Sequence, residues 1–257
     1  MYKIDKKRAM FILNKEYDDT IFVLSKGEGS QMTFAETVAT ISNLKVKANA
    51  RDIILVKSIQ NGLDYLLDKL YYDDLYFDKD ILCMINRYVA ANENFDNIGG
   101  FRKGNIKIGG AKHRGTNPFQ LEYEFDILKC WYKNEKENKG RKYIELALKL
   151  FKHQFFGDGN KRTAQLMMNG LLVKKGYAPF VINFYDENTS KDLVDYYDND
   201  NIIPLFKTML KAQKETMLSY CIPGEEKKIE EEYENDLEII EGGKWIYQKK
   251  KIIKKFN

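Results

Sequence analysis

The chain has 257 residues, of which 44% are hydrophobic and 31% are charged, and its formal net charge is +4. This composition is typical of a folded globular protein and excludes a disordered chain. Because the charges nearly balance, nucleic acid is not an expected partner. No apolar run approaches the roughly 18 residues that a membrane-spanning helix needs, so we expect no membrane partner either.

Cysteine usage and the first residues of the chain predict a cytoplasmic location. Cys83, Cys130 and Cys221 are too few and too widely spaced for a disulfide framework or a zinc site, which indicates reduced thiols. The charged residues 5–8 leave no room for the apolar core of a secretory signal. The abundance of Lys, Asn and Tyr is typical of proteins from AT-rich bacterial or phage genomes.

Hydrophobic spacing predicts a mostly helical chain, with a short strand at residues 20–24. Thr33 and Glu36 have the spacing of a capping box at the start of a helix. The best-defined helix ends at Gly176, which is suited to a C-cap, and Pro179 follows it. Helices are expected at residues 33–44, 52–70, 78–92, 122–134, 143–153, 162–175 and 192–218.

Two segments depart from this helical pattern. Residues 97–117 are rich in Gly, and Ile106 and Ile108 alternate with polar or small residues, which indicates a short hairpin or a glycine-rich loop. Near the end of the chain, residues 225–241 are strongly acidic and the last residues are rich in Lys. This charge pattern predicts a solvated, peripheral tail.

The chemistry is concentrated in residues 152–165, Lys-His-Gln-Phe-Phe-Gly-Asp-Gly-Asn-Lys-Arg-Thr-Ala-Gln. A loop rich in Gly precedes a new helix, whose free N–H groups and positive dipole end form an anion site. Lys161 and Arg162 add cations that suit a phosphate, and Asp158 suits Mg²⁺ bound to the same phosphates. The alternative is a structural turn in which Asp158 or Asn160 caps the helix.

This string resembles the signature of the Fic/Doc family, His-x-Phe-x-Asp/Glu-Gly-Asn-Gly/Lys-Arg. Residues 101–113 are similar to the flap of that family, a hairpin that aligns the target segment, and residues 28–37 are similar to the region that carries its inhibitory Glu. The resemblance extends over about residues 25–210. It implies an all-α, Fic-type helical bundle with a short β-hairpin flap.

The resemblance also divides the chain into three parts. Residues 1–75 are expected to form an N-terminal helical extension that contains the inhibitory segment. Residues 76–220 are expected to form the Fic core, and residues 221–257 the charged C-terminal tail.

The implied function is that of a protein adenylyltransferase, which uses ATP and Mg²⁺ to transfer AMP to a hydroxyl side chain of an unknown target protein. The alternatives are a catalytically weakened, nucleotide-binding Fic regulator and a Doc-like protein kinase toxin. Gly159 stands where Doc-like toxins carry Ala, which favours nucleotidyl transfer. An antitoxin or a second copy of the chain are further partners that the resemblance allows.

The resemblance assigns roles residue by residue. Asp158 is the expected magnesium ligand and catalytic carboxylate, and Glu28 the inhibitory residue. The expected nucleotide-binding residues are Gly157, Gly159, Asn160, Lys161, Arg162 and Gln165. The flap residues expected to hold the target are Ile108, Gly109 and Gly110.

Two positions depart from the family pattern. Gln154 occupies the place of the catalytic His, and an amide does not act as a general base near neutral pH. Three explanations stay open: His153 reaches the site through an expanded loop, positioning and Mg²⁺ supply most of the catalysis, or activity is lost. At the second position, Gln165 replaces an Arg that pairs with the inhibitory Glu in many members, so Glu28 loses its main ion-pair partner.

Overall fold

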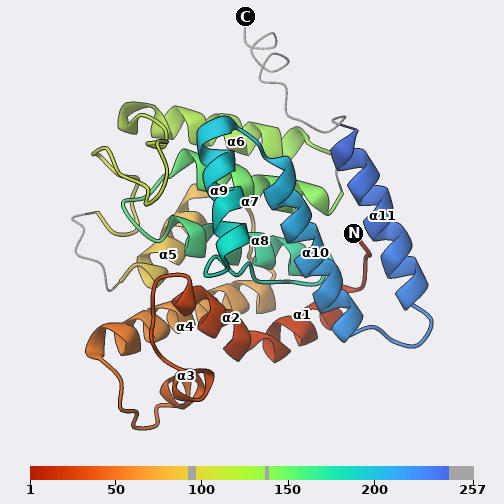
Figure 1. Ribbon diagram of the computed structural model, residues 1–257, viewed down its shortest axis with the longest axis horizontal. Coiled ribbons are helices and arrows are strands. Elements are labelled where there is room, and N and C mark those ends of the chain that lie inside the picture. Colours follow the sequence, from red (N-terminus) through yellow and green to blue (C-terminus); the bar gives the residue numbers. More distant parts are fainter. Residues whose placement is uncertain (92–96, 137–138, 243–257) are drawn as a thin grey trace, which may run out of the picture.

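The computed structural model describes residues 1–91, 97–136 and 139–242 (Figure 1). Over these ranges the protein is helical and contains no strand, as the all-α prediction requires. The helices are α1 (Lys6–Lys15), α2 (Tyr17–Lys26), α3 (Phe34–Ile41), α4 (Ala50–Tyr71), α5 (Lys79–Val89), the 3-10 turn η1 (Pro118–Gln120), α6 (Leu121–Asn134), α7 (Arg141–His153), α8 (Asn160–Lys174), α9 (Glu187–Asn199), α10 (Ile203–Ser219) and α11 (Glu226–Glu241).

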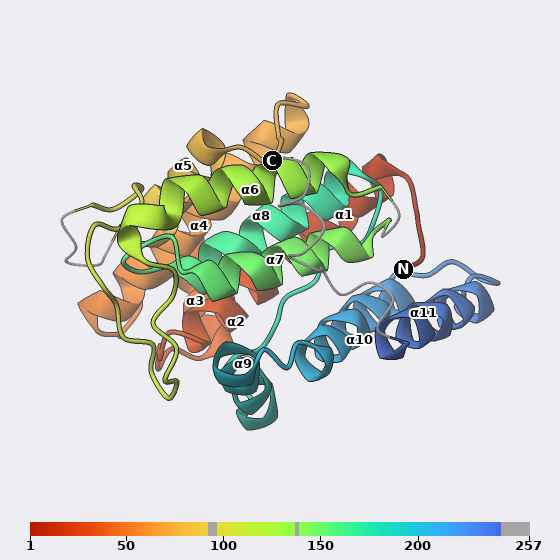
Figure 2. The same ribbon diagram turned by 90° about the horizontal axis from the view of Figure 1, so that it is seen from above.

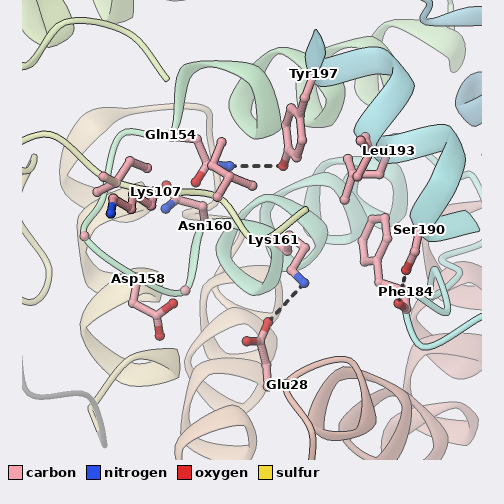
Figure 3. Close-up of a pocket in the computed structure, with 16 residues that line it drawn as sticks. Glu28, Lys107, Gln154, Asp158, Asn160, Lys161, Phe184, Ser190, Leu193 and Tyr197 are labelled. Carbon is pink, nitrogen blue, oxygen red and sulfur yellow. Dashed lines mark hydrogen bonds and ion pairs between the residues drawn. The ribbon is translucent and has the colours of Figure 1, made fainter. Parts of the chain in front are cut away.

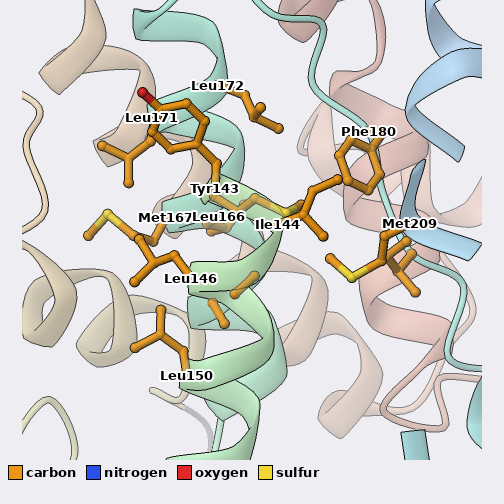
Figure 4. Packing of buried hydrophobic residues seen from close by; sticks show 14 of the residues in the cluster. Tyr143, Ile144, Leu146, Leu150, Leu166, Met167, Leu171, Leu172, Phe180 and Met209 are labelled. Carbon is orange, nitrogen blue, oxygen red and sulfur yellow. The ribbon is translucent and has the colours of Figure 1, made fainter. Parts of the chain in front are cut away.

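Helix α8 is the centre of the bundle and packs against α1, α4, α5 and α7. Its Leu166 and Met167 are fully buried, as are Ile144 and Leu146 of α7. Figure 4 shows these side chains interleaved between the two helices. Each such side chain contributes about 1.5–3 kcal/mol when it is removed from water, so the packing fixes the position of α8 and of both its ends.

A glycine lets α8 lie close to its neighbours. A Cβ atom at Gly170 would collide with the side chains of Leu66, on α4, and Leu75. The helix ends as the sequence predicts, because Gly176 adopts a left-handed φ of 78° and the Tyr177 N–H donates to the Leu172 carbonyl at 2.9 Å.

Two predictions of local structure are wrong. Residues 20–24 belong to helix α2, where Ile21 and Leu24 are buried, because α2 packs on α3 and α4 and this packing outweighs strand propensity. The helix expected at residues 192–218 is divided into α9 and α10, because Asp200 has a φ of 58° and Pro204 starts the second helix. The capping box of Thr33 and Glu36 is confirmed.

The acidic stretch near the end of the chain is a docked helix rather than a solvated tail. Helix α11 packs along α10, and Figure 2 shows both at the end of the molecule away from α5. Ile229 and Ile240 are buried, and Asp236 forms an ion pair with Arg141 at the start of α7. The prediction failed because the sparse apolar residues of this stretch fall on one helix face, which the high charge obscures. The Lys-rich end predicted beyond it lies outside the described residues.

None of the helices in the described ranges combines the length and the apolar character needed to cross a membrane.

Candidate active site

A cavity of about 290 Å³ opens where four segments meet: the end of α2, the α7–α8 loop, the segment before α6, and α9. Figure 3 shows its labelled side chains converging from these segments. The lining residues are Glu28, Ile106, Lys107, Ile108, Gly109, Gln154, Gly157, Asp158, Gly159, Asn160, Lys161, Phe184, Ser190, Leu193, Val194 and Tyr197.

The amino-terminal end of α8 forms one wall and has no side-chain cap. Gly159 precedes the helix with a left-handed φ of 72°, and the first turn contains no acidic residue. A Cβ at Gly159 would also crowd Ala90 and Asn86, at 3.1 Å from each. The free N–H groups and the positive dipole end therefore remain available to an anion, as the sequence predicts.

Lys161 adds a cation to this wall. Its Nζ lies 5.4 Å from the centre of the Phe184 ring, which supports the side chain from α9's side of the cavity. The Asn160 side chain, in contrast, braces the loop. Its Oδ1 accepts from the Phe156 N–H and its Nδ2 donates to the Phe156 carbonyl, both at 2.9 Å. Asn160 thus lines the cavity with its side-chain amide already bonded to the loop.

Asp158 is held from behind the cavity by Arg162. The Arg162 guanidinium donates to Asp158 Oδ2 at 2.6 Å and also to the Val89 carbonyl. Only 1% of the Arg162 side chain is exposed, and it is absent from the lining, so it supports the Asp158 carboxylate instead of opening directly into the cavity. Asn86 fixes the same loop, because its Nδ2 donates to the Asp158 carbonyl at 2.8 Å.

Gln154 lines the cavity with a fixed amide. The residue ends α7 in a left-handed conformation, with φ 53° and ψ 62°. Its Nε2 donates to the Phe151 carbonyl at 2.7 Å and to the Tyr197 hydroxyl at 3.1 Å. The Phe151 carbonyl can only accept, so the nitrogen must face it, and Oε1 is the remaining polar atom of the amide.

His153 does not line the cavity. Its Nδ1 lies 2.8 Å from Thr116 Oγ1, and its ring packs 5.2 Å from the ring of Phe155. The α7 helix continues through His153 and the left-handed turn comes at Gln154, so the expanded loop that would bring His153 inward does not form.

Gln165 and Gly110 also lie outside the lining. Gln165 is 1% exposed, and its Oε1 accepts from the Ile182 N–H at 2.7 Å. Its Nε2 has no hydrogen-bond partner among the described residues. Gln165 is one turn into a buried helix, so it serves the packing of the segment before α9. Gly110, with a φ of 76°, turns the chain beyond the cavity, whereas Ile108 and Gly109 line it.

Glu28 brings a negative charge to the mouth of the anion site. It follows the end of α2, and its Oε1 lies 3.7 Å from Lys161 Nζ and 3.6 Å from Arg162 Nε. Figure 3 shows the pair with Lys161 bridging the two walls of the cavity. The side chain is 22% exposed, so the pair is only partly screened by water.

The segment expected to form a hairpin flap contains no strand within the described residues. Its polar groups bond to other elements: Asp198 of α9 accepts from the N–H groups of Lys112 and His113, and the His113 ring contacts the Lys152 carbonyl. Arg102 anchors the base of the segment by donating to the Gln154 carbonyl at 2.6 Å and to the Gly104 carbonyl at 2.8 Å. Burial lowers the pKa of Arg102. Its hydrogen bonds to these carbonyls keep the buried side chain in place. The hairpin is missing because these outside contacts replace cross-strand bonds.

Sequence reasoning missed the contribution of α9 and the segment before it. Phe184, Ser190, Leu193, Val194 and Tyr197 complete the cavity, and burial raises the pKa of Tyr197 well above its usual range. Their apolar spacing is the same as that of ordinary core residues, so no local signal distinguishes them.

Comparison with known proteins identifies the bundle. Residues 76–172 match the model of the Fic/DOC family. Residues 76–172 form a Fic/DOC family domain. The match begins at the boundary between the expected extension and the expected core, and it includes α7, α8 and the loop between them.

Relatives and solved structures of the Fic/DOC domain agree with this assignment. A protein adenylyltransferase Fic of Nematostella vectensis is 23% identical over 83% of this chain and 50% of its own length. The protein adenylyltransferase Fic of Aedes aegypti is 26% identical over 75% of this chain and 39% of its own length. The chain thus spans half or less of these relatives.

The fold is shared more completely than the sequence. A Fic domain containing signaling protein of Bacteroides thetaiotaomicron superimposes with a TM-score of 0.66 at 14% identity, over 93% of this chain and 92% of that one. Fic-1 of C. elegans superimposes with a TM-score of 0.69 at 18% identity, over 82% of this chain and 65% of that one. These likenesses confirm the helical fold.

Proposed function

We propose that this protein binds ATP in the cavity and transfers its AMP moiety to a hydroxyl group of a target protein. The observation that carries the proposal is the uncapped start of α8, with Lys161 beside it, inside a cavity to which α9 adds the apolar side chains of Leu193 and Val194. Phosphates suit the helix end and the cation, and Leu193 and Val194 suit the face of a base. The names of the curated relatives support the adenylyl transfer.

The carboxylate of Asp158 suits Mg²⁺ only as an ion that arrives bound to the nucleotide. The described residues contain no cluster of three side chains that could hold a resident metal. Mg²⁺ is commonly held by one or two carboxylates together with substrate phosphates and water. Asp158 would supply the carboxylate, and the ion would neutralise charge on the phosphates.

Transfer forms a bond between the target oxygen and the α-phosphorus, while the bond to the departing pyrophosphate breaks. The hydroxyl proton leaves to solvent or to pyrophosphate, because the Gln154 amide does not take up a proton near neutral pH. Gln154 Oε1 instead orients the hydroxyl by accepting its hydrogen bond. The chain thus relies on position and electrostatics, and we expect turnover about 10²–10⁴ slower than with a general base.

Glu28 is the proposed inhibitory residue. Its carboxylate pairs with Lys161 and Arg162, the cations nearest the start of α8, and it competes with the phosphates for Lys161, which lines the cavity. Because Gln165 is committed to the Ile182 N–H, Lys161 takes the role of the cation that Glu28 engages in this chain.

A second candidate is a nucleotide-binding regulator without transferase activity. The specific observation in its favour is the Gln154 amide, bonded to Phe151 and Tyr197, together with the exclusion of His153 from the cavity lining. This candidate predicts ATP binding without modification of any hydroxyl.

The test compares Lys161→Ala with Lys174→Ala, a change at the opposite end of the same helix. Lys174 contacts the Asp73 carbonyl, far from the cavity, and is the matched control. Calorimetry with ATP and Mg²⁺ should show at least about tenfold weaker binding for Lys161→Ala and no change for Lys174→Ala. Absence of ATP binding by the wild type would refute the proposal.

Intact-mass analysis of the wild type after incubation with ATP and Mg²⁺ separates the reactions. A gain equal to one AMP supports adenylyl transfer, and a gain equal to one phosphate assigns a kinase instead. ATP binding with no gain, even in Gln154→His combined with Glu28→Gly, is the result that the regulator predicts.

A further inference from the structure

The segment between α5 and α6 borders the cavity and is strongly cationic. Lys103, Lys107, Lys112 and Arg114 are all exposed, and no Asp or Glu occurs between residues 97 and 121. None of these four cations forms a salt bridge with another described residue. The charge is therefore available to a partner.

The neighbouring elements neutralise little of this charge. Asp198 is the carboxylate that meets the segment, and it accepts from the backbone N–H groups of Lys112 and His113. These bonds hold the pKa of Asp198 below its usual range. Glu28, the carboxylate on the opposite side of the cavity, is already paired with Lys161 and Arg162.

The backbone of the same segment suits an extended polypeptide. Residues 103–107 make no backbone–backbone hydrogen bonds within the described chain. Apart from the Gly104 carbonyl, which accepts from Arg102, their N–H and C=O groups are open to a partner. Ile106 and Ile108 line the cavity and alternate with Lys107, so a strand placed here would meet both apolar and cationic side chains.

We propose that this cationic segment selects an acidic polypeptide, in which Asp or Glu residues flank the hydroxyl that receives the nucleotide. That the bound polypeptide carries a hydroxyl acceptor rests on the proposed function. That its flanking residues are acidic rests only on the charge of the segment. Opposite charges on the segment and on the polypeptide raise the rate of association, and like charges exclude basic partners.

The part of the segment that borders the cavity offers no aromatic side chain to a nucleic acid. Residues 102–118 contain no Phe, Tyr or Trp on which bases could stack, and the exposed ring of Phe119 follows them in η1. The ring of His113 is already stacked on Tyr197, with ring centres 5.8 Å apart. A polypeptide uses the open backbone edge, whereas single-stranded nucleic acid would use only the charges.

The experiment measures binding of labelled random copolymers to the full chain by fluorescence anisotropy, without ATP. We expect a copolymer of Glu and Tyr to bind, and a copolymer of Lys and Tyr not to bind. Lys103→Glu combined with Arg114→Glu should weaken binding of the acidic copolymer at least about tenfold. The matched control, Lys211→Glu with Lys227→Glu, lies on α10 and α11 and should change nothing.

Two further measurements keep the outcome interpretable. ATP affinity by calorimetry should be the same in both double variants, which shows that the fold and the nucleotide site are intact. A higher salt concentration should weaken binding of the acidic copolymer by the wild type, because the charges are exposed.

The proposal is overturned if both copolymers bind equally, if the control variant loses binding as much as the test variant, or if a single-stranded oligonucleotide of matched charge binds as tightly. Loss of ATP binding in the wild type would contradict the proposed function and leave the copolymer result to be judged separately.

Discussion

Replacing Gln154 with His should restore a general base and accelerate AMP transfer. The backbone permits the change, because φ 53° and ψ 62° lie in the left-handed region that His tolerates better than most residues. The Tyr197 hydroxyl, now 3.1 Å from Gln154 Nε2, is placed to hold one ring nitrogen. The other nitrogen can then accept the proton of the attacking hydroxyl.

The expected acceleration in Gln154→His depends on the general base that is gained and on the Gln154 hydrogen bond that is lost. A positioned general base contributes about 10²–10⁴ in rate. The bond from Gln154 to the Phe151 carbonyl is lost, at a cost of about 1 kcal/mol in the free energy of unfolding. Because one of the two anchoring bonds disappears, we expect the lower end of the range, about 10²-fold faster transfer.

The assay is the rate of AMP incorporation into the protein itself, followed by intact mass with ATP and Mg²⁺. In Gln154→His the rate should rise with pH through the normal range of a His pKa, about 6–7, whereas the wild type should lack this step. Gln154→Leu should be no faster than the wild type. His153→Ala should also leave the rate unchanged, because His153 lies outside the cavity lining.

Two results would refute this reasoning. If Gln154→His binds ATP as the wild type does but transfers AMP no faster, proton removal does not limit the reaction. If His153→Ala abolishes transfer, the base is His153 and the cavity is arranged differently during catalysis.

Three further predictions concern regulation and stability. Glu28→Gly should bind ATP about fivefold more tightly by calorimetry, because the change removes partly buried ion pairs worth about 1 kcal/mol, and unchanged affinity would contradict the inhibitory role. Asn86→Ala should lower the free energy of unfolding in urea by about 2–3 kcal/mol, since the buried amide bonds the Asp158 carbonyl; a loss under about 1 kcal/mol would argue against this brace. Arg8 holds the pKa of Glu225 down to about 2 through bonds of 2.8 and 2.6 Å. The unfolded chain therefore binds the extra proton first, so acid titration should cost about 1–2 kcal/mol of stability between about pH 5 and 2, and Glu225→Gln should remove that dependence.

The sequence was sufficient to predict the helices whose pattern is strong. α4 and α8 have wide apolar faces, and their bounds fall within two residues of the predicted ones at each end. The pattern failed where local propensity and tertiary packing disagree, as in α2, and where charge hides a narrow apolar face, as in α11.

The candidate site was predictable only where a contiguous motif carries it. The α7–α8 loop and the first turn of α8 bring Asp158, Gly159 and Lys161 to one cavity, and all three belong to the motif that the sequence singles out. The α9 wall could not be predicted, because Leu193 and Tyr197 reach the site through the path of the chain and not through a motif. The structure was also needed to show that Gln154 lines the cavity and that His153, its neighbour in sequence, does not.

The backbone at residue 154 has hydrogen bonds of its own besides those of the Gln154 side chain. The N–H of this residue donates to the Leu150 carbonyl, and its own carbonyl accepts from Arg102, which also anchors the segment that borders the cavity. The side chain can therefore change while the frame around it stays in place. Codons for Gln and His differ only in their last base, so a single point mutation separates the present chain from one with a proton acceptor at this position. On the proposed function, one nucleotide change would therefore supply a general base with no other part of the domain rebuilt.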